Sequence, residues 1–473
     1  MLLLSTLCIP FIAAIILLFV KHNEKANYVA IACSGVTMAL AFNIAFNGAT
    51  SFDANWILSI NARFLLSADG LAKILVLLTG ISFPAIFIAT SKNEIKNRNQ
   101  FLSLMLFTQT GLLGVFLAGD ALLFYFFWEL ALIPVYFLCS IWGGEKRVAI
   151  TFKFFIYTFL GSLLMLIGII LVYTNTPDHS FLIGSFKSAL LTKGQQLTAF
   201  ALFFTAFAIK MPIFPLHTWQ PDAYEQSPTP VTMVLSAVMV KMGLYGVIRW
   251  LLPLFPAASL SHAHFVVTLS IIGVLYASFI AIRQDDVKRL IAYSSIAHIG
   301  LMSAALFTFK SIGVQGVMIQ LFSHGINVLG LWIIADIIEQ QTGTRSMKAL
   351  GGLAKKQPTL AILLVGFAFA NIALPLTNAF VGEFLMFNAI FQFSPWMAAF
   401  AGVSVVLAAI YTLNMVQKIA YGEVSDAISK MQLPNKNAQS ILIVLLVIVF
   451  VTGVYPQLLF NISSDTLQQL FVK

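Results

Sequence analysis

The sequence contains fourteen apolar segments of about the length that a helix needs to cross a membrane, roughly 20 residues. Inside the hydrocarbon layer the backbone polar groups must be satisfied within the protein, which a helix achieves by itself. The chain is therefore expected to be an all-α polytopic membrane protein with about 14 transmembrane helices. The approximate limits of the segments are 2–20, 28–46, 71–90, 101–118, 120–142, 151–173, 197–215, 228–252, 264–282, 288–307, 312–338, 358–394, 397–418 and 440–460.

Composition excludes a water-soluble globular protein. The 473 residues are 59% apolar and 10% charged, whereas soluble domains are about 45–50% apolar and about 25% charged. The first apolar segment has no basic residue before it and no small-residue cleavage site after it, so it is expected to remain as a first span rather than act as a cleaved signal peptide. One continuous membrane domain is the resulting interpretation.

Basic residues alternate between the two sets of loops. The net charge is +9, and 17 of the 27 Lys and Arg residues follow odd-numbered spans while five follow even-numbered ones. Short loops that carry the basic excess stay in the cytoplasm, so both termini are predicted on the opposite, periplasmic side. That orientation requires an even number of spans, which fourteen satisfies. The positive charge is thus explained by cytoplasmic loops, and no nucleic-acid partner is expected.

Four charged residues lie deep within predicted spans. Lys210 precedes two prolines, Lys241 is near the middle of the eighth span, Glu129 is in the fifth, and Glu383 follows a break in the twelfth. An unpaired charge at the bilayer centre costs on the order of 2.5–3.5 kcal/mol, so each of these residues requires a partner or a purpose. Two structural ion pairs are one explanation. Proton or ion translocation is the favoured one, because ionisable residues within membranes are functional by default.

Two histidines extend this set. His298 and His324 lie inside the tenth and eleventh spans, where a histidine is either an interhelical hydrogen bonder or a proton relay. Because two lysines, Lys210 and Lys241, also lie deep within predicted spans, the proton relay is favoured. Asp336, near the cytoplasmic end of the eleventh span, is expected to be a carboxylate at the membrane interface.

The chain contains no motif for a redox cofactor or a nucleotide. It has no GxGxxG after a strand, no Walker loop, and no haem or cluster ligand set, and Cys8, Cys33 and Cys139 form no CxxC. No metal and no cofactor are therefore expected on this chain. Any oxidoreductase activity must belong to a partner.

Six short stretches surround the deep polar residues. They are Trp128-Glu129, Lys210-Met-Pro-Ile-Phe-Pro-Leu-His217-Thr-Trp-Gln-Pro-Asp222-Ala, Ser227-Pro-Thr, Lys241-Met-Gly-Leu-Tyr-Gly246, Asp286-Val-Lys-Arg-Leu-Ile-Ala-Tyr293-Ser-Ser and Ser323-His324-Gly. In this order they resemble the antiporter-like proton-channel subunits of respiratory complex I, over roughly residues 100 to 420. That family includes subunits L, M and N and relatives in the multisubunit sodium/proton antiporters.

The resemblance implies a fold and a set of roles. Two inverted five-helix repeats are expected, spans four to eight and nine to thirteen, with helices 7 and 12 broken. The implied divisions are residues 1–95, 96–255 and 256–420 for helices 1–3 and the two repeats, and 421–473 for helix 14 and the tail. The resemblance also implies that Glu129 pairs with Lys210. It further implies that protons pass through Lys210, Lys241, His298, His324 and the site of Glu383.

Two features distinguish the chain within the family and resemble its subunit M branch, the counterpart of mitochondrial subunit four. Glu383 stands where subunits L and N and their counterpart in the sodium/proton antiporters typically have a lysine, and the chain lacks the long lateral helix of subunit L. The implied function is a proton-translocating subunit of NADH-quinone oxidoreductase in the bacterial inner membrane. Its implied partners are L-like and N-like subunits, with FMN, iron–sulfur clusters and quinone on partner subunits. The alternatives are a subunit of a sodium/proton antiporter and a packing element whose charges clamp helices.

Overall fold

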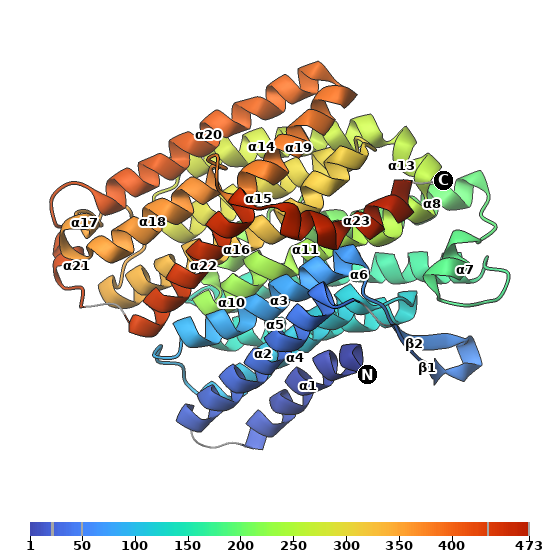
Figure 1. The fold of residues 1–473 in the computed structure, drawn as a ribbon, viewed down its shortest axis with the longest axis horizontal. Coiled ribbons are helices and arrows are strands. Elements are labelled where there is room, and N and C mark those ends of the chain that lie inside the picture. The colour runs from blue at the N-terminus through green and yellow to red at the C-terminus, as the bar shows by residue number, and fades with distance from the viewer. Residues whose placement is uncertain (20–22, 49–50, 433–434, 472–473) are drawn as a thin grey trace.

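The computed structural model is a bundle of helices that run roughly along one direction (Figure 1). The N-terminus and the hairpin of β1 (Phe52–Ile57) and β2 (Ala62–Leu66) lie at one end of the bundle. The short helices α17 (Leu353–Lys356) and α21 (Asp426–Ser429) lie at the other. Lys21 and Lys473, which entered the count of basic loops, are outside the described residues. The structure describes residues 1–19, 23–48, 51–432 and 435–471.

Within the described residues, twelve helices are long and apolar enough to span a membrane, and they match twelve of the fourteen predicted segments. They are α1 (Leu2–Phe19), α2 (Asn23–Phe46), α3 (Gly70–Ala89), α4 (Arg98–Leu117), α5 (Ala121–Trp142), α6 (Arg147–Tyr173), the composite helix Thr229–Leu254, α14 (Ala263–Arg283), α15 (Val287–Leu306), α16 (Ser311–Thr342), α20 (Pro395–Ala420) and α22 (Lys436–Val454). The all-α membrane fold is thus confirmed.

The other two predicted segments are interrupted helices. α8 (Lys193–Lys210) ends before the prolines, and the chain resumes as α9 (Gln220–Gln226). α18 (Pro358–Asn371) and α19 (Asn378–Phe393) are separated in the same way. Both breaks occur where sequence analysis placed them, because proline cannot donate the hydrogen bond that would continue a helix. The exact number of spans and the inverted repeats stay predictions.

The composite helix Thr229–Leu254 contains two wider turns. It consists of α10 (Thr229–Val234), the π-turn η2 (Leu235–Met239), α11 (Lys241–Gly246), the π-turn η3 (Val247–Leu251) and α12 (Leu252–Leu254). Single π-turns inside helices are frequent at functional sites. Hydropathy does not distinguish a π-turn from an α-turn, so the sequence did not predict them.

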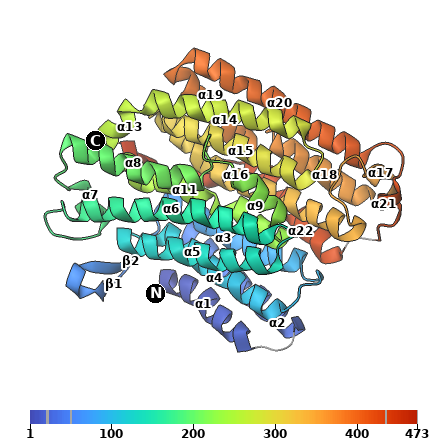
Figure 2. The same cartoon turned by 180° about the vertical axis from the view of Figure 1, so that it is seen from behind.

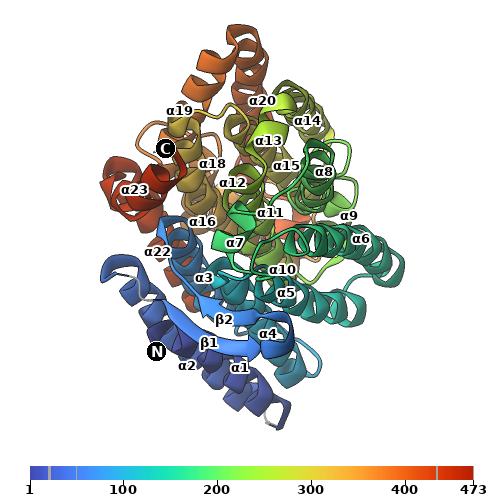
Figure 3. The same ribbon diagram turned by 90° about the vertical axis from the view of Figure 1, so that its right-hand side faces the viewer.

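Three features were not predicted. An antiparallel hairpin, β1 (Phe52–Ile57) and β2 (Ala62–Leu66), joined by the 3₁₀ turn η1 (Leu58–Ile60), lies at the end of the bundle that faces the viewer in Figure 3. The predicted span 440–460 ends earlier, at Val454. The chain then forms a separate helix, α23 (Gln457–Phe471), which contacts α3 and α16. Four short helices complete the fold: α7 (Ile183–Lys187), α13 (Pro256–Ser261), α17 (Leu353–Lys356) and α21 (Asp426–Ser429).

The long helix α16 runs through the interior of the bundle (Figure 2) and contacts α3, α15, α18 and α19. Glycine allows its closest approach to α19. A Cβ on Gly316 would lie 2.9 Å from the carbonyl oxygen of Gly382, and a Cβ on Gly382 would lie 2.7 Å from Oε1 of Gln320. Two small residues thus bring α16 against the first turns of α19, where Glu383 lies.

Candidate functional site

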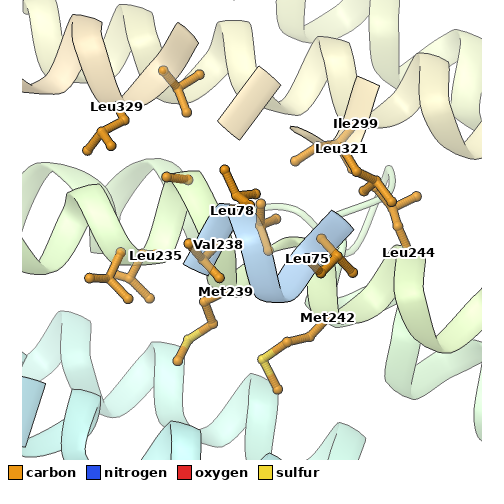
Figure 4. Close-up of a cluster of buried hydrophobic side chains, with 14 of the residues drawn as sticks. Leu75, Leu78, Leu235, Val238, Met239, Met242, Leu244, Ile299, Leu321 and Leu329 are labelled. Carbon is orange, nitrogen blue, oxygen red and sulfur yellow. The ribbon is translucent and has the colours of Figure 1, made fainter. Parts of the chain in front are cut away.

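Lys241 lies at the start of α11 and is fully buried, with 0% of its surface exposed. Its Nζ donates a hydrogen bond of 2.6 Å to the carbonyl oxygen of Ser236 and lies 2.9 Å from Nδ1 of His324. Apolar side chains from α3, α15, α16 and the composite helix gather around this part of the helix, among them Met239 and Met242 (Figure 4). An amine in such surroundings depends strongly on its few polar contacts.

The first π-turn supplies one of those contacts. The amide of Val240 would bond the carbonyl of Ser236 in an α-helix, but it bonds the carbonyl of Leu235 instead, at 3.1 Å. The carbonyl oxygen of Ser236 is therefore available to the side chain of Lys241. The wider π-turn therefore lets the backbone of the same helix accept a hydrogen bond from the Lys241 amine.

His324 of α16 connects Lys241 to α15. Its Nδ1 faces Lys241, and its Nε2 lies 3.3 Å from the hydroxyl of Ser295. The ring of His298, one turn further along α15, has its centroid 5.4 Å from that of His324. A neutral histidine has one donor nitrogen and one acceptor nitrogen, so a ring held between two polar groups can accept a proton on one side and release one on the other.

His298 contacts the carboxylate of Glu383. Nδ1 of His298 lies 3.1 Å from Oε1 of Glu383, and Nε2 of Gln320 donates to the same oxygen at 3.4 Å. A small cavity of about 20 Å³, bordered by His298, Glu383 and Asn371, adjoins this contact. That volume is enough for about one water molecule. Polar groups therefore continue from Lys241 to Glu383 across four helical elements.

Lys210 and Glu129, the predicted pair, interact electrostatically without a direct contact. Lys210 is 2% exposed, and its Nζ has no hydrogen-bond partner. The two side chains interact electrostatically but do not approach within 4.0 Å. The physical reason is that the Glu129 carboxyl faces the hydroxyls of Tyr125 and Ser162, while Nζ of Lys210 lies 5.7 Å from the ring centroid of Trp128.

The break after Lys210 lies against the helix that carries Lys241. A Cβ on Gly243 would lie only 2.8 Å from the amide nitrogen of Met211, so the two segments touch because residue 243 has no side chain. The hydroxyl of Tyr224, on α9, faces the side chains of Gln220 and Ser236. Gln220 and Tyr224 of α9 therefore form a buried polar cluster with Ser236, the residue whose carbonyl bonds Lys241.

Asp336, the expected interface carboxylate, lies near the end of α16 and is enclosed by protein. It is 3% exposed, and its Oδ2 accepts a hydrogen bond of 2.9 Å from Nδ2 of Asn93. The side chain is buried because α16 is enclosed by other helices as far as residue 338.

Two residues that the sequence analysis did not single out complete the site. Ser295 stands three residues before His298, and Gln320 stands four residues before His324. Residues three or four apart share one helix face, so this spacing was a usable signal. Ser236 could not be found in this way, because its role depends on the π-turn.

Comparisons with known proteins indicate the family of the chain. Residues 118–412 match the family described as NADH:quinone oxidoreductase/Mrp antiporter, TM. The NADH-quinone oxidoreductase subunit M of Rhodobacter capsulatus is 35% identical, over 98% of this chain and 94% of that protein. Subunit M of Escherichia coli strain K12 is 34% identical, over 94% of this chain and 93% of that protein. These relatives confirm the subunit M branch that Glu383 indicated.

Solved structures have the same fold. A chain of respiratory complex I from Thermus thermophilus with bound NADH superposes with a TM-score of 0.91 at 26% identity, covering 99% of this chain and all of that one. A chain of the Mrp complex from Dietzia sp. DQ12-45-1b superposes with a TM-score of 0.90 at 20% identity, covering 100% of this chain and 97% of that one. The second likeness is one of fold.

Proposed function

We propose, because this chain belongs to the NADH:quinone oxidoreductase/Mrp antiporter membrane family, that it is a proton-translocating subunit of the membrane arm of NADH-quinone oxidoreductase. The observation that carries the proposal is the 2.9 Å contact between Lys241 and His324. Two ionisable side chains share a buried position there, and from it the polar contacts lead through Ser295 and His298 to Glu383.

The proton path follows from these contacts. Lys241 holds a proton on Nζ and passes it to His324, which relays it through Ser295 toward His298. His298 then delivers it to Glu383 across the 3.1 Å contact. The transfers from Lys241 to His324 and from His298 to Glu383 are between groups close to hydrogen-bond distance, which is the geometry that proton transfer requires. Between Ser295 and His298, whose Nε2 has no hydrogen-bond partner, one water molecule would complete the path.

Glu129 supplies the switch. Its carboxylate interacts with Lys210 from beyond 4.0 Å, so a modest movement of α5 or of the break after α8 changes how strongly the ammonium is stabilised. Bringing opposite charges together favours a retained proton, and separating them favours its release. A conformational change in a partner subunit can therefore drive a proton by opening or closing this pair.

The orientation is part of the proposal. Connections that follow the third, fifth, seventh, ninth and eleventh predicted spans line a single basin at one end of the bundle. Twelve of the 17 basic residues that follow odd-numbered spans lie on those connections, which supports a cytoplasmic position for this end. Both termini are then periplasmic, in a bacterial inner membrane. The direct partners are L-like and N-like subunits, and flavin, iron–sulfur clusters and quinone reside on other chains.

The test is purification of the native complex through a tag on this chain. Copurification of flavin-bearing and iron–sulfur proteins, together with NADH-driven proton uptake after reconstitution, is expected. Sodium/proton exchange by a complex with no flavin-bearing partner would instead place the chain in an antiporter.

A further inference from the structure

A large polar basin lies at the end of the bundle where α9 and α17 are found (Figure 2). Its volume is about 1290 Å³, and it is lined by the connections α3–α4, α5–α6, α9–α10 and α14–α15 and by the segment after α16. Its walls are polar because acidic and basic side chains pair across them. Arg289 bonds Glu225 at 2.6 Å, and Arg345 bonds Asp286 at 2.9 Å. Burial raises the pKa of Asp286.

A buried carboxylate lies directly beneath this basin. Asp336 does not itself line the basin, but Asn93, Thr229, Lys288 and Glu339, which surround it, do. Oδ2 of Asp336 accepts from Asn93, whereas Oδ1 is buried and has no hydrogen-bond partner. A buried carboxylate oxygen without a donor is costly, so its retention calls for a purpose.

An ion pair of Lys288 and Glu339 lies between Asp336 and the basin. Nζ of Lys288 lies 2.6 Å from Oε2 of Glu339, and the hydroxyl of Thr229 donates to the same oxygen at 3.3 Å. Arg345 approaches Oε1 of Glu339 at 3.8 Å. Lys288 is thus committed to Glu339 and interacts with Asp336 only electrostatically. The hydroxyl of Thr229 also faces Asp336, but Oδ1 of Asp336 has no partner at hydrogen-bond distance.

Two antiparallel helices join this carboxylate to the Lys241 site. α16 and the composite helix are linked at the basin by Thr229 and Glu339, and deeper in the bundle by Lys241 and His324. Asp336 precedes Glu339, at the basin end of α16, by less than one turn, and His324 lies twelve residues away on the same helix. At 1.5 Å per residue this is about 18 Å.

Polar atoms occur along that interval. Oγ of Ser236, Oδ1 of Asn327 and Nε1 of Trp332 are buried there without hydrogen-bond partners. Water molecules in such positions typically bond two to four polar partners. Water between Asp336 and Lys241 would find these atoms as bonding partners.

We propose that Asp336 is the group that takes protons from the basin and delivers them to the Lys241–His324 site. The inference rests on the proposed function, which it deepens by assigning the uptake side of the path. A proton from basin water adds to Oδ1 of Asp336, and it then leaves to water on the side toward His324. Only O–H bonds form and break, and the Lys288–Glu339 pair stays intact.

The test compares three variants in the whole complex, reconstituted in vesicles, by NADH-driven proton uptake as a function of pH. Asp336→Asn should lower coupled turnover about tenfold, most at alkaline pH where protons are scarce, and Asp336→Glu should retain more than half. Glu94→Gln is the matched control, because Glu94 is an exposed carboxylate on the rim of the same basin. It should behave as the wild type.

Two outcomes would overturn the inference. In the first, Asp336→Asn has wild-type turnover at every pH while Lys241→Ala loses turnover. Proton uptake would then occur elsewhere, and the proposed function would stand. Wild-type turnover in both would contradict the proposed function as well.

A second measurement covers the case in which Asp336→Asn fails to assemble. Asn93→Ala removes the donor to Oδ2 and leaves the carboxyl in place. A hydrogen bond to a carboxylate favours its ionised form, so the alkaline fall in turnover should move to higher pH in this variant. An unmoved profile would contradict a role for Asp336 in proton uptake, since a purely structural bond would not shift it.

Discussion

Replacing Glu383 with Gln removes the proton acceptor at the end of the path and leaves nearly the same shape. In the structure, Oε1 of Glu383 lies 3.1 Å from Nδ1 of His298 and accepts from Nε2 of Gln320 at 3.4 Å. The amide keeps an oxygen for Gln320 but carries no charge and takes up no proton. Assembly should therefore be retained while proton transfer from His298 is lost.

The size of the effect follows from the contact. A hydrogen bond to a charged group contributes about 1.5–3 kcal/mol, and about 1.4 kcal/mol corresponds to a tenfold change in rate. Losing this stabilisation of a protonated His298 should slow coupled turnover roughly 10- to 100-fold. Glu383→Asp keeps the charge, and the adjoining cavity of about 20 Å³ can hold one bridging water, so part of the activity should remain.

The assay is NADH-driven quinone reduction and proton uptake by the intact complex in sealed vesicles. Glu423→Gln is the control, because the side chain of Glu423 is 96% exposed and its partner is the surface residue Lys355. Wild-type turnover and proton stoichiometry in Glu383→Gln would refute the reasoning that ends the path at this carboxylate.

Three further substitutions test other parts of the account. Glu129→Gln should leave the chain assembled but lower coupled turnover in vesicles about tenfold, since about 1.4 kcal/mol of lost stabilisation at Lys210 has that effect; an unchanged rate would exclude the switch. Gly330→Ala should destabilise the chain by about 1–3 kcal/mol, because the new Cβ would meet a phenylalanine ring of α18. Thermal unfolding in detergent measures this, and Gly402→Ala, with nothing within 4 Å of its Cβ, is the control. Burial raises the pKa of Asp120, so its protonated form is favoured in the fold and stability should increase as the pH falls through that pKa. Asp120→Asn should abolish this gain, and an unchanged pH dependence of the unfolding temperature would contradict it.

Much of the fold could be predicted because a membrane-spanning helix must be a long apolar segment, which hydropathy detects. Twelve of the fourteen segments and both broken helices occur where the sequence placed them. The π-turns were not predictable, since they exchange one backbone partner for another without changing composition. The hairpin 52–66 is short and lies outside the membrane segments, where apolar length carries no signal.

The sequence predicted which residues belong to the site better than it predicted which of them touch. Lys241, His298, His324 and Glu383 were each expected from their depth in a span, and the structure brings them together. Their distances depend on how glycines set the helix separations, which a single sequence does not reveal. Glu129 is an example of a contact that the sequence did not give, because its carboxyl faces the hydroxyls of neighbouring residues and makes no direct contact with a lysine.

The proposal that protons cross the membrane through this chain's own buried side chains depends above all on Lys241. Lys241→Ala removes the amine that contacts Ser236 and His324, and a methyl group is readily accommodated among the surrounding apolar side chains. The measurement is the number of protons pumped per electron by the reconstituted complex. We expect Lys241→Ala to give an assembled complex in which both this ratio and coupled quinone reduction are lowered. A wild-type ratio in Lys241→Ala would contradict it.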